Sequence, residues 1–229
     1  MAYGECNYSS RWRIKRLSHA SRFVAAIKLL DMKQEDVFLD YGGGDGHLIT
    51  LAAESQPDAS YSLFEPSANL DEARVNLGHV RGVVLYSSTT EIAPATFSKI
   101  SCLEVLEHVT PADILPSVLR DIFRLLRPGG TLVVSMPIEF GPVSLFKNIF
   151  RTVTRSTFPG TNVKTIALSA VGLASKVPRV EGHMGFDYRK VRRALVLTGF
   201  KLEETRFSPI GLAGPLCNSQ VLYRLRKPD

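Results

Sequence analysis

Short apolar runs alternate along the chain with stretches in which apolar residues recur at helical spacing. Short apolar runs are typical of strands buried on both faces of a parallel sheet. The predicted strands are 37–39, 61–66, 83–86, 97–103 and 131–137. One predicted helix, 20–30, precedes the first strand, and the helices 47–53, 67–78 and 114–126 lie between the strands. This alternation predicts an α/β fold with a mostly parallel sheet and helices on both faces.

The C-terminal part of the chain follows a different pattern. A helix is expected over 188–198, where Gly199 provides a residue suited to end it. The runs 200–207 and 219–225 follow without a crossover helix between them. We expect these two runs to form an antiparallel strand pair.

Residues 138–182 interrupt the rhythm of strands and helices. Within 140–155, apolar residues such as Phe146 and Phe150 would share one helical face, and Lys147 and Arg151 the other. A segment after the fifth strand is well placed to select a substrate. A basic amphipathic helix could also lie in an anionic membrane interface. The segment is therefore either a substrate lid or a membrane contact.

Two local features affect the ends of the predicted elements. Residues 1–19 are polar and basic, which predicts either an arm over the substrate or a solvated tail. Thr110, Pro111 and Asp113 together resemble a helix start, and Pro116 should kink or delay the helix that follows.

A glycine-rich run joins the first strand to the first helix of the α/β alternation. The run Asp40-Tyr41-Gly42-Gly43-Gly44-Asp45-Gly46 is suited to a sharp turn against a ligand, because glycine has no Cβ and accepts positive φ. The helix after it points free N–H groups at the loop. His47 stands where the dinucleotide fingerprint G-x-G-x-x-G needs its third glycine, so a dinucleotide is disfavoured.

An acid follows the second strand. Glu65 lies roughly twenty residues beyond the glycines, where a carboxylate can accept hydrogen bonds from ribose hydroxyls. The position supports a nucleoside ligand and does not distinguish between kinds of nucleoside.

Composition, charge and cysteine content indicate the cellular compartment in which the protein works. The chain has 229 residues, of which 45% are hydrophobic, a net charge of +6 and three cysteines without a C-x-x-C motif. Three widely spaced cysteines favour a reducing compartment over a disulfide framework. We find no leader pattern and no apolar run of membrane-spanning length, and we expect a cytoplasmic protein, with peripheral membrane contact through 140–155 left open.

Three segments resemble one family. Residues 37–46, the Glu-Val-Leu-Glu-His sequence at 104–108, and the Leu-Arg-Pro-Gly-Gly-Thr-Leu segment within 126–135 are similar to motifs of class I S-adenosylmethionine-dependent methyltransferases, close to the small-molecule and ubiquinone-type O-methyltransferases. The resemblance implies a Rossmann-like, seven-stranded, mostly parallel sheet with the cofactor S-adenosylmethionine at the carboxyl ends of the strands. Residues 87–90 and 98–99 depart from the family pattern, because acids are common there.

The resemblance also implies a division of the chain and a set of cofactor residues. The chain 1–229 would be one methyltransferase domain, with an N-terminal arm and helix (1–33), a cofactor-binding core (34–137), a substrate-lid insertion (138–182) and a C-terminal helix and strand pair (183–229). The candidate cofactor-binding residues are Asp40, Gly42, Gly43, Gly44, Gly46, Glu65 and Glu104.

His108 and His183 are the candidate catalytic bases, because both are expected at the mouth of the pocket. If the 104–108 turn is helical, Glu104, Glu107 and His108 share one face. A similar Glu-x-x-Glu-His arrangement binds magnesium or manganese in small-RNA 2′-O-methyltransferases, and His183 would be a fourth ligand. The alternative, which we favour, is that these residues line the substrate entrance without a metal.

The acceptor is predicted less sharply than the cofactor. We expect a hydroxyl group on a small molecule such as a glycan, a polyketide or another secondary metabolite. A lipid-linked acceptor is the second candidate, and nucleic acid is disfavoured because the chain shows no RNA-binding appendage. A non-catalytic protein that keeps the fold as a binding module is a further alternative. The sequence does not predict an oligomeric state.

Overall fold

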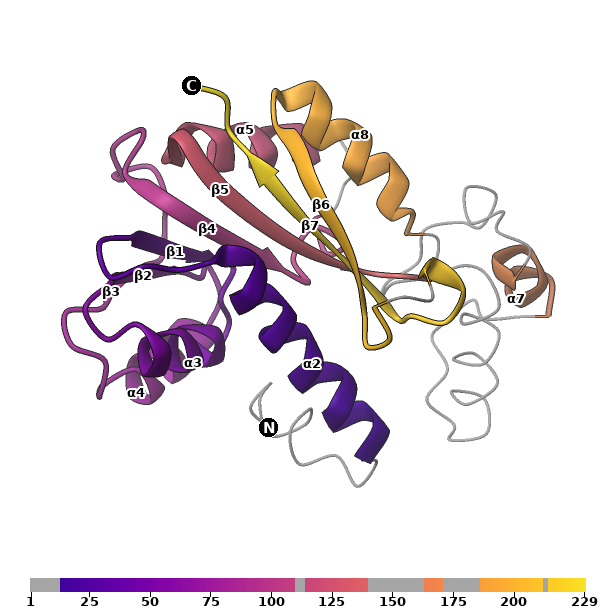
Figure 1. Ribbon diagram of the computed structural model, residues 1–229, viewed down its shortest axis with the longest axis horizontal. Coiled ribbons are helices and arrows are strands. Elements are labelled where there is room, and N and C mark those ends of the chain that lie inside the picture. Colours follow the sequence, from indigo (N-terminus) through magenta and orange to yellow (C-terminus); the bar gives the residue numbers. More distant parts are fainter. Residues whose placement is uncertain (1–12, 110–113, 140–162, 171–185, 212–213) are drawn as a thin grey trace.

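The computed structural model describes residues 13–109, 114–139, 163–170, 186–211 and 214–229. Seven strands form one sheet in the order β3-β2-β1-β4-β5-β7-β6, with helices on both faces (Figure 1). The strands are β1 (Val37–Tyr41), β2 (Ser60–Phe64), β3 (Val84–Tyr86), β4 (Phe97–Leu103), β5 (Leu126–Pro137), β6 (Lys201–Ser208) and β7 (Gln220–Arg226). The helices are α2 (Arg13–Leu30), α3 (His47–Ser55), α4 (Asn69–Asn76), α5 (Leu115–Leu125), α7 (Val163–Ala170) and α8 (Tyr188–Thr198), and Gly214–Leu216 forms the short helix η3.

The predicted topology is confirmed. Strands β1 to β5 pair in parallel, whereas β7 is antiparallel to both β5 and β6. The strand order reverses between β1 and β4, since β2 and β3 extend to one side of β1 and β5 lies on the other side of β4. In open α/β sheets such a reversal leaves a crevice at the carboxyl ends of the strands.

Two apolar cores lie on the two faces of the sheet. Consecutive strand residues point to opposite faces, and so Phe38 packs into the core beneath α2 and α3, while Leu39 packs into the core beneath α5 and α8. Both side chains are fully buried. This burial on two sides explains why apolar residues occupy both faces of the central strands, and it fixes the carboxyl ends of the strands relative to one another.

Helix α2 begins earlier than the sequence pattern predicts. It starts at Arg13, so residues 13–19 of the expected basic arm are helical. No glycine or proline stands in this stretch, and arginine and lysine are good helix formers. Residues 1–12 lie outside the described residues.

Strand β5 also begins earlier than the predicted 131–137. Leu126 pairs with Phe97 of β4, and the Gly129 N–H donates to the Lys227 carbonyl over 3.0 Å. The Arg-Pro-Gly-Gly segment therefore ends α5, as predicted, but continues as extended chain. Pro116 lies in the first turn of α5, where its missing N–H costs no helical hydrogen bond.

Several predicted features lie outside the described residues. These are the helix start at Thr110–Asp113, the amphipathic segment 140–155, most of the lid 138–182, and His183. Within the described part of the chain, no helix combines the length and the apolar character needed to span a bilayer.

Candidate active site

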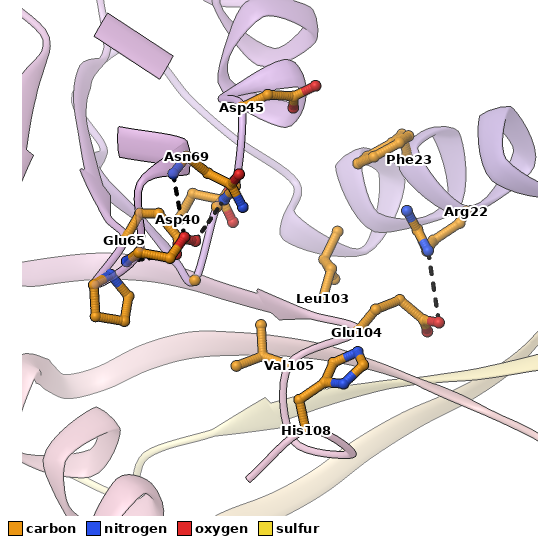
Figure 2. A pocket seen from close by; sticks show the side chains of 15 residues that line it. Arg22, Phe23, Asp40, Asp45, Glu65, Asn69, Leu103, Glu104, Val105 and His108 are labelled. Atoms are coloured by element: carbon orange, nitrogen blue, oxygen red, sulfur yellow. Dashed lines mark hydrogen bonds and ion pairs between the residues drawn. The ribbon is translucent and has the colours of Figure 1, made fainter. Parts of the chain in front are cut away.

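A cavity of about 450 Å³ lies at the carboxyl ends of β1, β2 and β4, where the strand order reverses (Figure 2). Asp40 comes from the end of β1, Glu65 follows β2, and Glu104 follows β4. Helix α2 closes another side with Arg22 and Phe23. The remaining lining residues are Gly42, Gly43, Gly44, Asp45, Pro66, Ser67, Asn69, Leu103, Val105 and His108.

The glycine loop turns sharply because its backbone is tied to the neighbouring strand. The N–H groups of Gly42 and Gly43 both donate to the Phe64 carbonyl, over 2.7 and 3.2 Å. Gly42 has a φ of 74°, and a Cβ there would stand 2.6 Å from a methyl group of Val105. Gly42 therefore needs to be glycine for both its conformation and its packing.

Gly44 and Gly46 differ in what lies beside them. Both have positive φ, 56° and 83°, but a Cβ on Gly44 would meet no atom within 4 Å, whereas one on Gly46 would stand 2.7 Å from Leu77. Gly44 lines the cavity, and its open side faces the space that a ligand would fill. Gly46 does not line the cavity; it begins α3 and lets Leu77 pack close to the helix N-terminus.

Glu65 is held against the glycine loop. Its two carboxylate oxygens accept hydrogen bonds from the Gly44 N–H at 3.0 Å and the Ser67 N–H at 3.1 Å. Each oxygen keeps a lone pair beyond these bonds. The carboxylate is therefore fixed at the cavity wall with acceptor capacity for a diol.

Asp40 is almost fully buried, with 3% of its surface exposed. Its Oδ1 accepts a 2.6 Å hydrogen bond from the Ser101 hydroxyl of β4. Burial raises the pKa of the Asp40 carboxyl from 3.8 to about 7, and the Asp45 and Glu65 carboxylates reinforce this against the opposing Ser101 bond and Arg22 charge. Asp40 is thus poised to change charge near neutral pH.

Arg22 and Glu104 point toward one another at one side of the cavity, away from Asp40 and Glu65 (Figure 2). Their closest charged atoms, Arg22 Nη1 and Glu104 Oε2, are 3.6 Å apart, and the Ser135 hydroxyl donates to Glu104 Oε1 at 3.2 Å. The Arg22 side chain is 10% exposed, and its Nε has no hydrogen-bond partner among the described residues. Arg22 lines the cavity, and a guanidinium at a cavity wall can bind an anionic ligand group.

The Glu104–His108 segment is a turn and not the helix that was considered. Glu104 has a φ of 55°, and the His108 N–H donates to the Val105 carbonyl. Glu104 and His108 line the cavity, whereas Glu107 is buried outside the lining. Burial, with the neighbouring Glu104 charge, raises the pKa of Glu107 well above its usual value.

The metal hypothesis is not supported within the described residues. There, no group of three or more histidine, cysteine, aspartate or glutamate side chains is placed to hold an ion. The proposed ligands Glu104, Glu107 and His108 do not share a helical face, because the segment is not a helix. His183 lies outside the described residues.

Of the predicted site residues, the structure gathers Asp40, Gly42, Gly43, Gly44, Glu65, Glu104 and His108 around one cavity. The pattern analysis missed Arg22, although Arg22 shares a helical face with Ala26 and Leu29, both buried. A charged residue on an apolar face was the available signal. The sequence pattern also gave no sign of Ser101. Its hydrogen bond to Asp40 becomes evident only when β4 is known to pair with β1.

The departures from the family pattern lie away from this cavity. Ser98 donates a 2.7 Å hydrogen bond to Asp36 at the opposite ends of the strands, and Lys99 is 4.0 Å from the same carboxylate. Thr89 donates to Asp121 of α5 at 2.7 Å. These residues have local structural partners and do not disrupt the cavity.

Comparison with known proteins agrees with this geometry. A family model described as a methyltransferase domain matches residues 11–204. Among solved structures, the N-methyltransferase NodS from Bradyrhizobium japonicum is 14% identical and superposes with a TM-score of 0.61 over 92% of this chain and 97% of that one. A Burkholderia thailandensis 1,6-didemethyltoxoflavin-N1-methyltransferase, with its substrate and S-adenosylhomocysteine bound, is 15% identical, with a TM-score of 0.62 over 99% and 86% of the two chains.

A third similar structure, the [4+2]-cyclase SpnF, is 12% identical, with a TM-score of 0.62 over 91% of this chain and 81% of that one. At these identities the structural likenesses establish the fold, and the family model establishes the relationship. The chain belongs to the methyltransferase-domain family and is a class I S-adenosylmethionine-dependent methyltransferase.

Proposed function

We propose that the protein transfers the methyl group of S-adenosylmethionine to a hydroxyl oxygen of a small-molecule acceptor. The observation that carries the cofactor part is the open side of Gly44 beside an anchored Glu65, at the point where the strand order reverses. A nucleoside can lie there against the loop backbone, which carries no side chain. Its ribose hydroxyls can donate to the Glu65 carboxylate, which the Gly44 and Ser67 N–H groups hold in place.

The other lining residues fit the methionyl end of the same ligand. The Arg22 guanidinium, which lines the cavity, would hold the α-carboxylate, and Glu104 would meet the α-ammonium group. Asp40 supplies negative charge beneath the loop. Gly42 and Gly43 keep the loop close to Asp40 and the sheet, so that the chain leaves room for the ligand.

When bound, the cofactor supplies an activated methyl group on a positively charged sulfur. The protein then mainly has to align the acceptor, and alignment of this kind can contribute up to about 7–11 kcal/mol. His108 lies at the exposed edge of the cavity and could remove the acceptor's proton, which adds a factor of about 10² to 10⁴. His183 remains a second candidate base.

A small acceptor is supported by the solved relatives. The Burkholderia thailandensis enzyme binds 1,6-didemethyltoxoflavin and S-adenosylhomocysteine, and both it and NodS are N-methyltransferases. The choice of oxygen over nitrogen therefore rests on the resemblance of the Glu-Val-Leu-Glu-His segment to O-methyltransferases.

The test is a methyl-transfer screen with tritiated S-adenosylmethionine and matched pairs of acceptors that differ only in carrying a hydroxyl or an amine. We expect label in hydroxyl compounds. Label confined to the amines would contradict the proposed atom, and no label with any acceptor, despite cofactor binding, would favour a binding module. Calorimetry with S-adenosylmethionine and S-adenosylhomocysteine separates that case from a degenerate site, which would bind neither.

A lipid-linked acceptor is the second candidate, because a helix over residues 140–155, which lie outside the described residues, would have an apolar face and a basic one. Co-sedimentation with anionic and neutral vesicles tests it, using wild type and a variant with Phe146→Ser and Phe150→Ser. Binding to anionic vesicles that the double substitution removes would support this candidate. Absence of binding by either protein would remove it.

A further inference from the structure

The cavity carries more negative than positive charge. Its described lining contributes four carboxylates, from Asp40, Asp45, Glu65 and Glu104, against a single guanidinium, from Arg22. The proposed cofactor is a cation, because its sulfonium is added to a zwitterionic methionyl group. The product left after methyl transfer is a thioether with no net charge. The cavity therefore meets two ligands of the same shape that differ by one unit of charge.

Asp40 is the carboxyl best placed to respond to that difference. It is buried at the end of β1, and the bare backbone of Gly43 covers it, since a Cβ on Gly43 would stand 2.7 Å from Asp40 Oδ2. Ser101 of β4 donates the hydrogen bond described above. The charged groups that face Asp40 are Asp45 at the loop, Glu65 after β2, and Arg22 on α2.

The balance of these groups keeps a large fraction of Asp40 protonated in the free protein up to about pH 7. Arg22 is already shared with Glu104, and the two other acids repel a charge on Asp40. The pKa of Asp40, raised to about 7 mainly by burial, agrees with this balance. A cation entering the cavity opposes the same repulsion and draws the carboxyl toward its ionised form.

We propose that Asp40 exchanges one proton with solvent during each cycle, so that its carboxylate selects the sulfonium cofactor and its protonated form accepts the neutral product. The proposal rests on the cofactor site proposed above. As the cofactor binds, the Asp40 O–H bond breaks and the proton passes to water. As the methyl group leaves the sulfur, the positive charge disappears, and Asp40 takes a proton back from solvent.

This exchange gives the protein a means of discriminating between cofactor and product. A carboxylate fixed permanently in its ionised form would be left without a compensating charge in the product complex. A carboxyl that takes up a proton avoids that penalty only when the product is present. Selectivity for the cofactor should therefore increase with pH, as the fraction of ionised Asp40 in the free protein increases.

The experiment is isothermal titration calorimetry from pH 5.5 to 8 with S-adenosylmethionine, S-adenosylhomocysteine, and sinefungin, which carries an amine in place of the sulfonium. Each titration is repeated in two buffers of different ionisation enthalpy, which counts the protons released. We expect about half a proton released per cation bound near pH 7 and about half a proton taken up per thioether bound. The affinity ratio of cofactor to product should rise by up to about 300-fold over this range if only ionised Asp40 accepts the cation and only protonated Asp40 accepts the product.

Two variants assign the effect to Asp40. Asp40→Asn keeps an acceptor for Ser101 and should abolish proton release and make the ratio independent of pH. Ser101→Ala removes a bond that favours the ionised form, so it should move the transition to higher pH, and it tests the proposal even if Asp40→Asn does not fold. Asp71→Asn, at an exposed position on α4, is the control for charge and should match wild type.

The outcomes distinguish this proposal from the one on which it rests. Binding of cofactor and product with a ratio that does not change with pH, or a proton release that Asp40→Asn leaves intact, overturns the inference alone. Failure of all three ligands to bind overturns the proposed cofactor site together with it.

Discussion

The glycine loop offers a matched pair of substitutions that separates ligand space from protein packing. Gly44→Ala and Gly46→Ala each add one methyl group at a residue with positive φ, 56° and 83°. The backbone cost of alanine in this region is about 1–2 kcal/mol at either position. Only the second methyl group meets protein, because Leu77 lies 2.7 Å from its position, whereas the first meets nothing within 4 Å.

Gly46→Ala should therefore mainly lower stability, whereas Gly44→Ala should mainly weaken ligand binding. Overpacking against Leu77 adds about 1–3 kcal/mol, so Gly46→Ala should lower the free energy of unfolding by about 2–5 kcal/mol and Gly44→Ala by only about 1–2 kcal/mol. Gly44→Ala should weaken S-adenosylmethionine binding by at least about tenfold, since its methyl group takes ligand space. Folded Gly46→Ala should bind nearly as well as wild type.

Urea unfolding gives the two free energies, and calorimetry at a temperature where both variants are folded gives the affinities. The reasoning is wrong if the two variants lose stability equally, because the contact with Leu77 would then have no cost. It is also wrong if Gly44→Ala binds the cofactor with wild-type affinity, since the open side of Gly44 would then not face the ligand.

Three further predictions follow from single residues. The pKa of Asp40 is raised from 3.8 to about 7 in the folded protein, so the folded state binds this proton more tightly than the unfolded chain does. The stability that this proton contributes is fully present below about pH 4 and is lost as the pH rises through 7. Urea unfolding should show that the free energy of unfolding of Asp40→Asn, relative to wild type, is roughly 2–3 kcal/mol higher at pH 8 than at pH 5. The same difference at both pH values would contradict the raised pKa. Arg22→Ala should weaken cofactor binding about 10- to 100-fold by calorimetry, because a hydrogen bond to a charged group contributes about 1.5–3 kcal/mol; Arg22→Lys controls for charge, and unchanged affinity in Arg22→Ala would exclude the role. His108→Ala should lower turnover in the tritium assay and leave cofactor affinity nearly unchanged, whereas lost binding would refute its role as the base.

Local pattern predicted the bounds of one central strand and one amphipathic helix correctly. Strand β4 was predicted at Phe97–Leu103 and helix α8 at Tyr188–Thr198, and both have these bounds in the structure. Apolar runs and helical spacing are direct records of burial, so they locate such elements well. The ends of α2 and β5 were predicted less well, because helix propensity extends α2 and pairing with distant strands extends β5.

The 104–108 turn shows the limit of spacing arguments. Its acids and histidine would share a face if the backbone were helical, but Glu104 has a positive φ and Glu107 is buried. The conformation depends on contacts with other elements, among them the Glu104 N–H bond to the Ser135 carbonyl of β5 and the ion pair with Arg22 of α2. No residue within the segment predicts these partners.

The sequence by itself determined the α/β class, the strand–glycine–helix unit and the acid after the second strand, because these depend on residues that are near neighbours in the chain. Only the tertiary structure decided that Gly44 faces the cavity while Gly46 faces Leu77, and that Arg22 meets Glu104. The raised pKa of Asp40 likewise comes mainly from burial, with the Asp45 and Glu65 carboxylates adding to it. Electrostatics and steric fit depend on distances through space, and those are set only when the sheet has assembled.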